Sequence, residues 1–120
     1  MAAHISNDST VIQVAIDGLT DNKLCRHQAG DIDIIVCRWQ GRYFAFANRC
    51  SHAAQPLHQG RIRQGALFCP HHGARFDLAT GNALSAPAVK PITRYNTRVV
   101  GEYLEVVVPN EALNRPSLEA

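Results

Sequence analysis

The chain has 120 residues and a mass of 13.2 kDa, which leaves room for one domain and excludes a large enzyme of several domains. Hydrophobic residues make up 46% of the sequence and charged residues 18%, a composition that excludes a disordered or fibrous protein. The net charge is +2, and the composition stands out in its six histidines and four cysteines. A chain of this size buries a modest core with little volume for a deep substrate pocket, so we expect function in surface loops.

The first residues lack the basic start and apolar stretch of a signal peptide, and no apolar run approaches the ~18 residues needed to cross a bilayer. We therefore expect a soluble, cytoplasmic protein without a membrane partner, and we expect a monomer. In a reducing cytoplasm, cysteines tend toward metal or redox roles rather than structural disulfides. The histidines and cysteines are thus candidate functional residues.

Alternating and β-branched runs predict strands along most of the chain. The first run, residues 11–16, places Ile12, Val14 and Ile16 on one face. The further strand-like runs, with turn residues between them, are 31–39, 42–47, 65–69, 74–78, 97–100 and 103–108. Two-residue hairpin loops are expected at Gln40-Gly41 and Gly101-Glu102.

No segment shows convincing helical periodicity, apart from a hint at residues 111–113. Many short strands with frequent turns indicate an all-β fold of antiparallel sheets, either sandwich-like or barrel-like. We expect one domain over residues 1–120, with its core at about 11–108 and tails at 1–10 and 109–120.

The positive charge is concentrated in the middle of the chain. Residues 34–101 carry nine bases and one acid, a net charge of +8, whereas the other residues carry three bases and nine acids, a net charge of −6. The bases stand mostly singly, without the basic runs or aromatic interleaving of a nucleic-acid module, so no nucleic-acid partner is expected. They are expected on solvated outward faces of strands, with docking of an acidic protein as the alternative.

Two loops that break the strand pattern carry paired cysteine and histidine. Cys50 and His52 form a C-x-H element, Cys69 and His72 form a C-x-x-H element, and sixteen residues separate the two elements. A thiolate and an imidazole so close in sequence can face one centre from a tight turn. The positive φ angles or close approaches that such turns need are permitted by Gly60, Gly65 and Gly73.

The order of these four residues along the chain helps to distinguish a zinc site from an iron site. Zinc accepts two Cys and two His, but zinc fingers usually group like ligands, so the alternating order argues weakly against zinc. A di-iron cluster with two thiolates on one iron and two imidazoles on the other needs one Cys and one His from each loop, which is the order found here. The arrangement C-x-H-x16-C-x-x-H, in a chain whose resemblance extends over roughly residues 11–108, resembles the Rieske family.

The resemblance implies one Rieske-type [2Fe-2S] cluster per chain, with Cys50 and Cys69 on an inner iron and His52 and His72 on an outer iron. His71 is the rival of His72, but the C-x-x-H spacing and the following glycine favour His72. The remaining histidines, expected at the surface or satisfied in the core, are His4, His27 and His58. The remaining cysteines, expected as small buried side chains with a disulfide as the second reading, are Cys25 and Cys37.

The resemblance also implies a proline-containing third loop over the cluster at residues 85–88, where an ordinary turn is the alternative. It implies a ferredoxin that takes single electrons from a flavin-containing ferredoxin reductase and passes them to the terminal oxygenase of a ring-hydroxylating dioxygenase. The alternatives are the Rieske-like small subunit of a nitrite reductase and a structural zinc-binding module. The expected apolar rim of the electron exit is Ala53, Ala54, Leu57, Pro70, His71 and Pro87.

The residues themselves favour a carrier over an enzyme, because the sequence shows no base–nucleophile set, mononuclear-iron triad, Rossmann motif or phosphate loop. Histidine ligation raises the potential to somewhere in about −150 to +300 mV, against about −400 mV for plant-type ferredoxins. High-potential relatives carry an extra Cys in each loop and two hydroxyls after the second histidine. The residues at those places here are Gln55, His71, Ala74 and Phe76, so we expect a potential near the low end, below zero millivolts.

Overall fold

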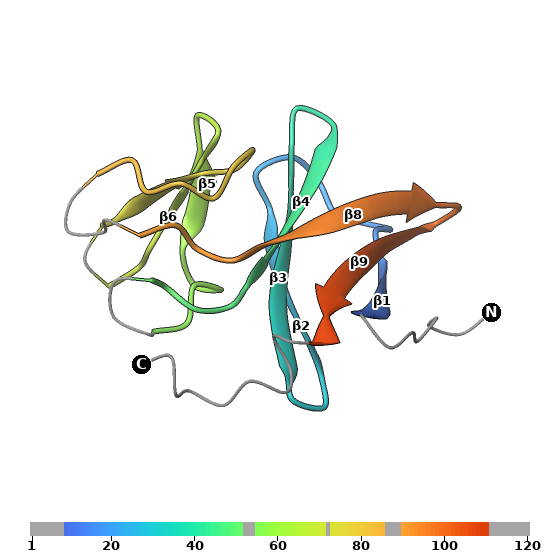
Figure 1. Ribbon diagram of the computed structural model, residues 1–120. Coiled ribbons are helices and arrows are strands. Elements are labelled where there is room, and N and C mark those ends of the chain that lie inside the picture. Colours follow the sequence, from blue (N-terminus) through green and yellow to red (C-terminus); the bar gives the residue numbers. More distant parts are fainter. Residues whose placement is uncertain (1–8, 52–54, 72, 86–89, 111–120) are drawn as a thin grey trace.

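The computed structural model describes residues 9–51, 55–71, 73–85 and 90–110, and these form two antiparallel sheets (Figure 1). The larger sheet has six strands in the order β1-β9-β8-β4-β3-β2 and is curled. Its strands are β1 (Ser9–Ala15), β2 (Leu24–Ala29), β3 (Ile32–Trp39), β4 (Arg42–Ala47), β8 (Arg94–Val100) and β9 (Tyr103–Pro109). The expected all-β fold of antiparallel sheets is confirmed.

The smaller sheet is inserted in the chain between β4 and β8 and lies beside the larger sheet in Figure 1. Its strands are β5 (Arg61–Arg63), β6 (Ala66–Phe68) and β7 (Arg75–Asp77), paired in sequence order. The two loops with paired cysteine and histidine belong to this part of the chain, since one precedes β5 and the other connects β6 to β7. The insertion therefore places both loops at the same sheet.

Strand β3 separates two hydrophobic cores. Ile34 and Val36 face the interior of the larger sheet, whereas Ile35 and Cys37 face the smaller sheet, and all four are 0% exposed. A strand that is buried on both faces has a continuous run of apolar residues rather than an alternating pattern, which explains why residues 34–37 are all apolar. The smaller sheet is thus packed onto the larger one through β3 and its neighbour β4.

The expected strands and turns are found close to where the sequence places them. The Gln40-Gly41 hairpin has φ angles of 52° and 75° at its two residues, and Gly101 has a φ of 60° in the β8–β9 hairpin. β1 begins at Ser9, two residues before the expected run. The hint of helix at 111–113 lies outside the described residues. None of the described residues belongs to a helix long and apolar enough to span a membrane.

Strands β2 and β5 are missing from the sequence-based prediction. β2 is a partly exposed edge strand whose middle three residues, 26–28, are polar, and β5 has only three residues, two of them arginines, so neither shows the apolar pattern of a typical strand. The turn residues next to these two strands are the sequence feature that could have indicated them. Gly30-Asp31 joins β2 to β3, and Gln64-Gly65, with φ angles of 52° and 77°, repeats the Gln-Gly turn found between β3 and β4.

Candidate metal centre

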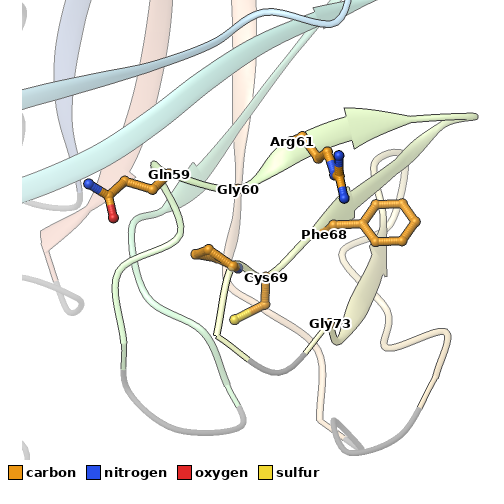
Figure 2. A pocket seen from close by; sticks show the side chains of 7 residues that line it. Gln59, Gly60, Arg61, Phe68, Cys69 and Gly73 are labelled. Atoms are coloured by element: carbon orange, nitrogen blue, oxygen red, sulfur yellow. The ribbon is translucent and has the colours of Figure 1, made fainter.

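The two loops each begin with a buried cysteine. Cys50 follows β4 by three residues and is 1% exposed, and Cys69 follows β6 directly and is 3% exposed. Both belong to the core between the two sheets, where Leu57 and Phe76 are also buried. Figure 2 shows the Cys69 sulfur pointing away from the ring of its neighbour Phe68. Two thiol groups are therefore held in an apolar setting at the base of the loops.

Each loop is closed by a backbone hydrogen bond of the same type. The Cys50 amide donates to the Gln55 carbonyl at 2.7 Å, and the Cys69 amide donates to the Ala74 carbonyl at 2.8 Å, so each cysteine is joined to the fifth residue after it. In the second loop, Gly73 adopts a φ of 73° and its amide also donates to the Cys69 carbonyl at 3.2 Å. The two cysteines thus occupy equivalent positions at the base of two matching loops.

The two expected histidine ligands, His52 and His72, fall between these closing residues in the sequence and lie outside the described residues. In the described part of the chain, no group of three or more His, Cys, Asp or Glu side chains gathers to hold a metal ion. Cys50 and Cys69 nevertheless suit an iron–sulfur cluster, because soft thiolate ligands select iron–sulfur centres and an apolar surround limits access of water. The donor set therefore fits the expected cofactor.

The first loop is held by a buried asparagine that sequence reasoning did not single out. Asn48 is 7% exposed, and its Oδ1 accepts a hydrogen bond from the Leu57 amide at 2.7 Å. Its Nδ2 lies 3.2 Å from Asp33 Oδ1 and 3.0 Å from His58 Nδ1. Asn48 therefore connects the start of the loop, its return segment and β3. The sequence carries no signal for this role, since an asparagine after a strand also fits an ordinary turn.

Asp33 links this network to the edge of the larger sheet. Arg26 on β2 donates two hydrogen bonds to the Asp33 carboxylate, both at 2.9 Å. The hydrogen bond from Arg26 is the main cause that holds the pKa of Asp33 below its ordinary value, and the contact with Asn48 acts in the same direction. His58 is part of the same network, so the expectation of a satisfied histidine is confirmed for it.

Ser85, at the start of the expected third loop, and Lys90, just after it, form hydrogen bonds near the other two loops. Ser85 Oγ accepts a hydrogen bond from the Arg75 amide at 3.3 Å, just after the second loop. At the other end, the Ser51 hydroxyl in the first loop donates to the Lys90 carbonyl at 2.6 Å. Residues 86–89 between these anchors lie outside the described residues. The third loop therefore stays a prediction.

One residue of the expected apolar rim is placed wrongly by the sequence. Leu57 is 0% exposed and packs in the core between the sheets, because Asn48 pins its amide beside β4. Pro70 and His71 are exposed, as a rim requires. The other expected rim residues, which lie outside the described part of the chain, are Ala53, Ala54 and Pro87.

Cys25 and Cys37 are thiols on opposite faces of the larger sheet. Cys37 pairs across the strands with Leu24, whereas Cys25 pairs with Val36, so the two side chains point in opposite directions. Burial raises the pKa of the Cys37 thiol to about 12. Both thiols are free rather than joined in a disulfide, and the expected burial is confirmed for Cys37, whereas Cys25 is partly exposed. Of the remaining histidines, His27 is half-buried on β2 and His4 lies outside the described residues.

Two glycines allow the spacer between the loops to pack closely. A Cβ added at Gly60 would lie 2.0 Å from the carbonyl oxygen of Phe68, so only glycine fits there. Gly65, with its positive φ, closes the β5–β6 hairpin against the ring of Trp39.

A pocket of about 380 Å³ opens beside the second loop (Figure 2). Its lining residues are Gln59, Gly60, Arg61, Phe68, Cys69, Pro70 and Gly73.

Comparison with known proteins identifies the family. Residues 10–96, well over half of the chain, match the family model described as the Rieske [2Fe-2S] domain, and this range contains both loops. The chain belongs to the Rieske [2Fe-2S] family. Its cofactor is a Rieske-type [2Fe-2S] cluster, so the zinc alternative is set aside.

Relatives of this Rieske protein are electron carriers. It is 34% identical to the anthranilate 1,2-dioxygenase ferredoxin subunit of Burkholderia cepacia over 94 residues, which is 78% of this chain and 87% of the relative. It is 28% identical, with a TM-score of 0.72, to the ferredoxin of carbazole 1,9a-dioxygenase from Nocardioides aromaticivorans IC177, covering 78% of this chain and 91% of that one. The expected role of electron carrier, rather than catalytic oxygenase, is confirmed.

A second similar solved structure is a complex of reduced oxygenase and oxidized ferredoxin in carbazole 1,9a-dioxygenase. The match has a TM-score of 0.74 at 23% identity and covers 80% of this chain and 91% of that one. At this identity the likeness concerns the fold. It agrees with the expected Rieske-like arrangement of antiparallel sheets.

Proposed function

We propose that this chain carries single electrons from a flavin-containing ferredoxin reductase to the terminal oxygenase of a ring-hydroxylating dioxygenase. The observation that carries the proposal is the similarity to a dioxygenase ferredoxin subunit over 87% of that subunit's length. The size of the chain agrees with a mobile carrier, and the described site is a pair of surface loops over a small sheet. We propose that residues 1–120 form a single Rieske-type domain that acts as a monomer in the cytoplasm.

We propose that Cys50 and Cys69 bind the inner iron of the cluster and that His52 and His72 bind the outer iron. The matching closures of the two loops support this assignment, because they present the two buried cysteines in equivalent positions. When bound, the cluster supplies a site that gains and loses one electron. The chain holds the thiolates in place through the Cys50 and Cys69 amide hydrogen bonds and keeps water from them through the surrounding core.

The apolar surround of the second loop supports a low reduction potential. Ala74 and Phe76 are both 0% exposed and carry no hydroxyl that could donate a hydrogen bond to the cluster. Donors of that kind stabilise the reduced, more negative state, so their absence from these two positions lowers the potential. A redox titration should therefore give a midpoint below zero millivolts. A midpoint above zero would contradict this part of the proposal.

The function is tested by anaerobic stopped-flow mixing. The reduced chain is mixed with oxidised terminal oxygenases, beginning with the oxygenase component of the B. cepacia anthranilate 1,2-dioxygenase system, and oxidation of the chain is followed by its visible absorption. A second mixing step uses the matching reductase as the electron donor. We expect one electron to leave each chain and product to form only when all three components are present. Co-purification with a large haem- and flavin-bearing subunit, without transfer to any oxygenase, would instead support the nitrite reductase alternative.

A further inference from the structure

The smaller sheet has one buried face and one exposed face. Ile62, Leu67 and Phe76 are neighbours across the three strands and point into the core, with exposures of 6%, 0% and 0%. The opposite face is formed by the residues that alternate with them. There Arg61 pairs with Phe68, and Phe68 pairs with Arg75, so the ring lies between two exposed arginines in register.

The exposed row continues past β7 with a leucine. The Arg75 carbonyl accepts a hydrogen bond from the Leu84 amide at 2.8 Å, next to the bridge between Phe76 and Ala83. Leu84 is 47% exposed. We call the exposed residues Arg61, Arg75 and Leu84, together with the partly exposed Phe68 between the two arginines, the arginine row. Arginine and aromatic side chains are enriched in protein interfaces.

The arginine row lies next to the second loop of the proposed metal centre. The guanidinium carbon of Arg75 is 6.0 Å from the centroid of the Phe68 ring, and Figure 2 shows Arg61 beside the same ring. Arg61 and Phe68 also line the pocket next to the second loop, and Cys69 follows Phe68 directly in the chain. A partner seated on the row would therefore be brought beside a proposed iron ligand.

The charge of this face is uncompensated in the described part of the chain. Elsewhere, Arg38 pairs with Asp21 at 3.2 Å and Arg98 pairs with Glu105 at 2.6 Å. Among the described residues, none of the arginines on the smaller sheet forms an ion pair of this kind. These arginines are Arg61, Arg63 and Arg75.

The acidic residue of the smaller sheet is already engaged. Asp77 Oδ2 accepts hydrogen bonds from the Thr80 amide at 3.0 Å and from the Thr80 hydroxyl at 2.9 Å, within the turn after β7. The exposed face thus presents three arginines and one carboxylate that is bound in a turn. Such a face attracts an acidic surface and offers planar donors that match carboxylates.

We propose that the arginine row docks an acidic surface of the terminal oxygenase, whose carboxylates accept hydrogen bonds from Arg61 and Arg75 on either side of the Phe68 ring. This proposal rests on the proposed function. The oxygenase is the partner that meets the reduced chain, in which the added electron makes the cluster site more negative. Positive charge beside the site offsets the repulsion between that negative charge and an acidic acceptor. During transfer, one electron leaves the chain, one enters the oxygenase, and no bond forms or breaks.

The test compares charge reversal on the row with charge reversal elsewhere. The variants are Arg61→Glu, the double variant Arg61→Glu/Arg75→Glu, and the control Arg42→Glu, which changes an exposed arginine of the larger sheet. Electron transfer from each reduced chain to the oxygenase is measured against ionic strength. We expect the double variant to be slowed about tenfold or more at low salt, since electrostatic steering changes association rates by about 10 to 10³. Added salt should slow the wild type and not the double variant.

Two small oxidants report on the charge of the face without an oxygenase. Hexacyanoferrate(III) is an anion and tris(1,10-phenanthroline)cobalt(III) is a cation, so the double variant should react more slowly with the first and faster with the second. The control Arg42→Glu should match the wild type with the oxygenase and with both oxidants. The Arg75 change could disturb the hydrogen bonds between Arg75 and Ser85. The single variant Arg61→Glu avoids this, because the Arg61 side chain forms no hydrogen bond among the described residues, so it tests the charge of the row alone.

The outcomes separate the docking surface from the function. Wild-type rates with the oxygenase in the double variant would overturn the arginine row and leave the proposed function intact. A loss confined to electron entry from the reductase would also overturn it, because the row would then serve another partner. Absence of transfer from the wild type to every oxygenase would overturn both. Equal slowing by Arg42→Glu would show that net charge, rather than this row, controls the rate.

Discussion

The two cores on either side of β3 are built in different ways. The core inside the larger sheet is formed mainly by long strands, and β1 and β9 pair over seven consecutive positions. The core under the smaller sheet is closed by strands of three residues and by loop residues such as Leu57 and Ile92, and it includes Cys50 and Cys69. The first core depends on its strands, whereas the second depends on loops that serve the metal centre.

This difference shows how the protein separates stability from function. Strand pairing over many residues secures the larger sheet without help from a ligand. The smaller sheet has only three residue pairs at each of its two strand contacts, so strand pairing contributes less to its stability. We therefore expect the cluster, bound at the two proposed loops, to stabilise this region, since a ligand that binds only the folded state shifts the unfolding equilibrium. The predictions below test this contrast.

The largest effect is expected from loss of a proposed thiolate ligand. Cys50→Ser or Cys69→Ser should abolish the cluster, because each removes one of the two sulfur ligands proposed for the inner iron. The matched control Cys25→Ser, a partly buried thiol of the larger sheet, should keep the cluster. Iron and sulfide content and the visible spectrum measure the result. A full complement of cluster in either loop variant would contradict the assignment.

The next largest effect is expected at Gly60. Gly60→Ala places a methyl group 2.0 Å from the Phe68 carbonyl oxygen, so the backbone must shift, at a cost of about 3 kcal/mol in the free energy of unfolding. Gly41→Ala is the control, since its Cβ meets nothing within 4 Å and only its positive φ costs about 1 kcal/mol. Denaturant unfolding of the cluster-loaded protein compares them. Equal losses would show that the close approach in the smaller sheet does not limit stability.

A smaller loss is expected from the asparagine that holds the first loop. Asn48→Ala leaves the buried Leu57 amide without its acceptor and should lower the free energy of unfolding by about 2 kcal/mol. It should also speed hydrogen exchange at that amide. Asn96→Ala, an exposed asparagine on β8, is the control and should change stability by less than about 0.5 kcal/mol. Unchanged exchange at Leu57 in Asn48→Ala would contradict the role of this side chain.

The sequence predicts much of the larger sheet because its strands have long apolar runs, such as Ile34–Cys37, and turns such as Gln40-Gly41. It predicts the loop cysteines because cysteine with histidine at fixed spacing is rare in chance sequence. It does not predict β5, because this strand has only three residues and two of them are arginines on the outward face of the smaller sheet. Nor does it predict Asn48 or the burial of Leu57, because both depend on contacts between residues distant in the chain or on opposite sides of a loop.

The smallest effect is a pH dependence from Asp33. The Arg26 hydrogen bond lowers the pKa of this carboxyl, so the ion pair stabilises the fold above the unfolded pKa of about 4 and loses that stabilisation as the pH falls through the folded value. The pair is largely exposed, so solvent screens it and its contribution at neutral pH is small. Asp33→Asn should therefore unfold at a lower temperature than the wild type at pH 7, with the gap closing at a pH well below the unfolded pKa. An equal gap at both pH values would contradict this sign.

The central claim is that two loops of this chain hold a [2Fe-2S] cluster with one cysteine and one histidine from each. Pulsed electron paramagnetic resonance of the reduced protein, produced with isotope-labelled histidine, tests it most directly. We predict a signal from one unpaired electron that is coupled to nitrogens of two histidines, with one coupling lost in His52→Cys and the other in His72→Cys. A colourless, silent protein, or a cluster signal without histidine coupling, would contradict the claim.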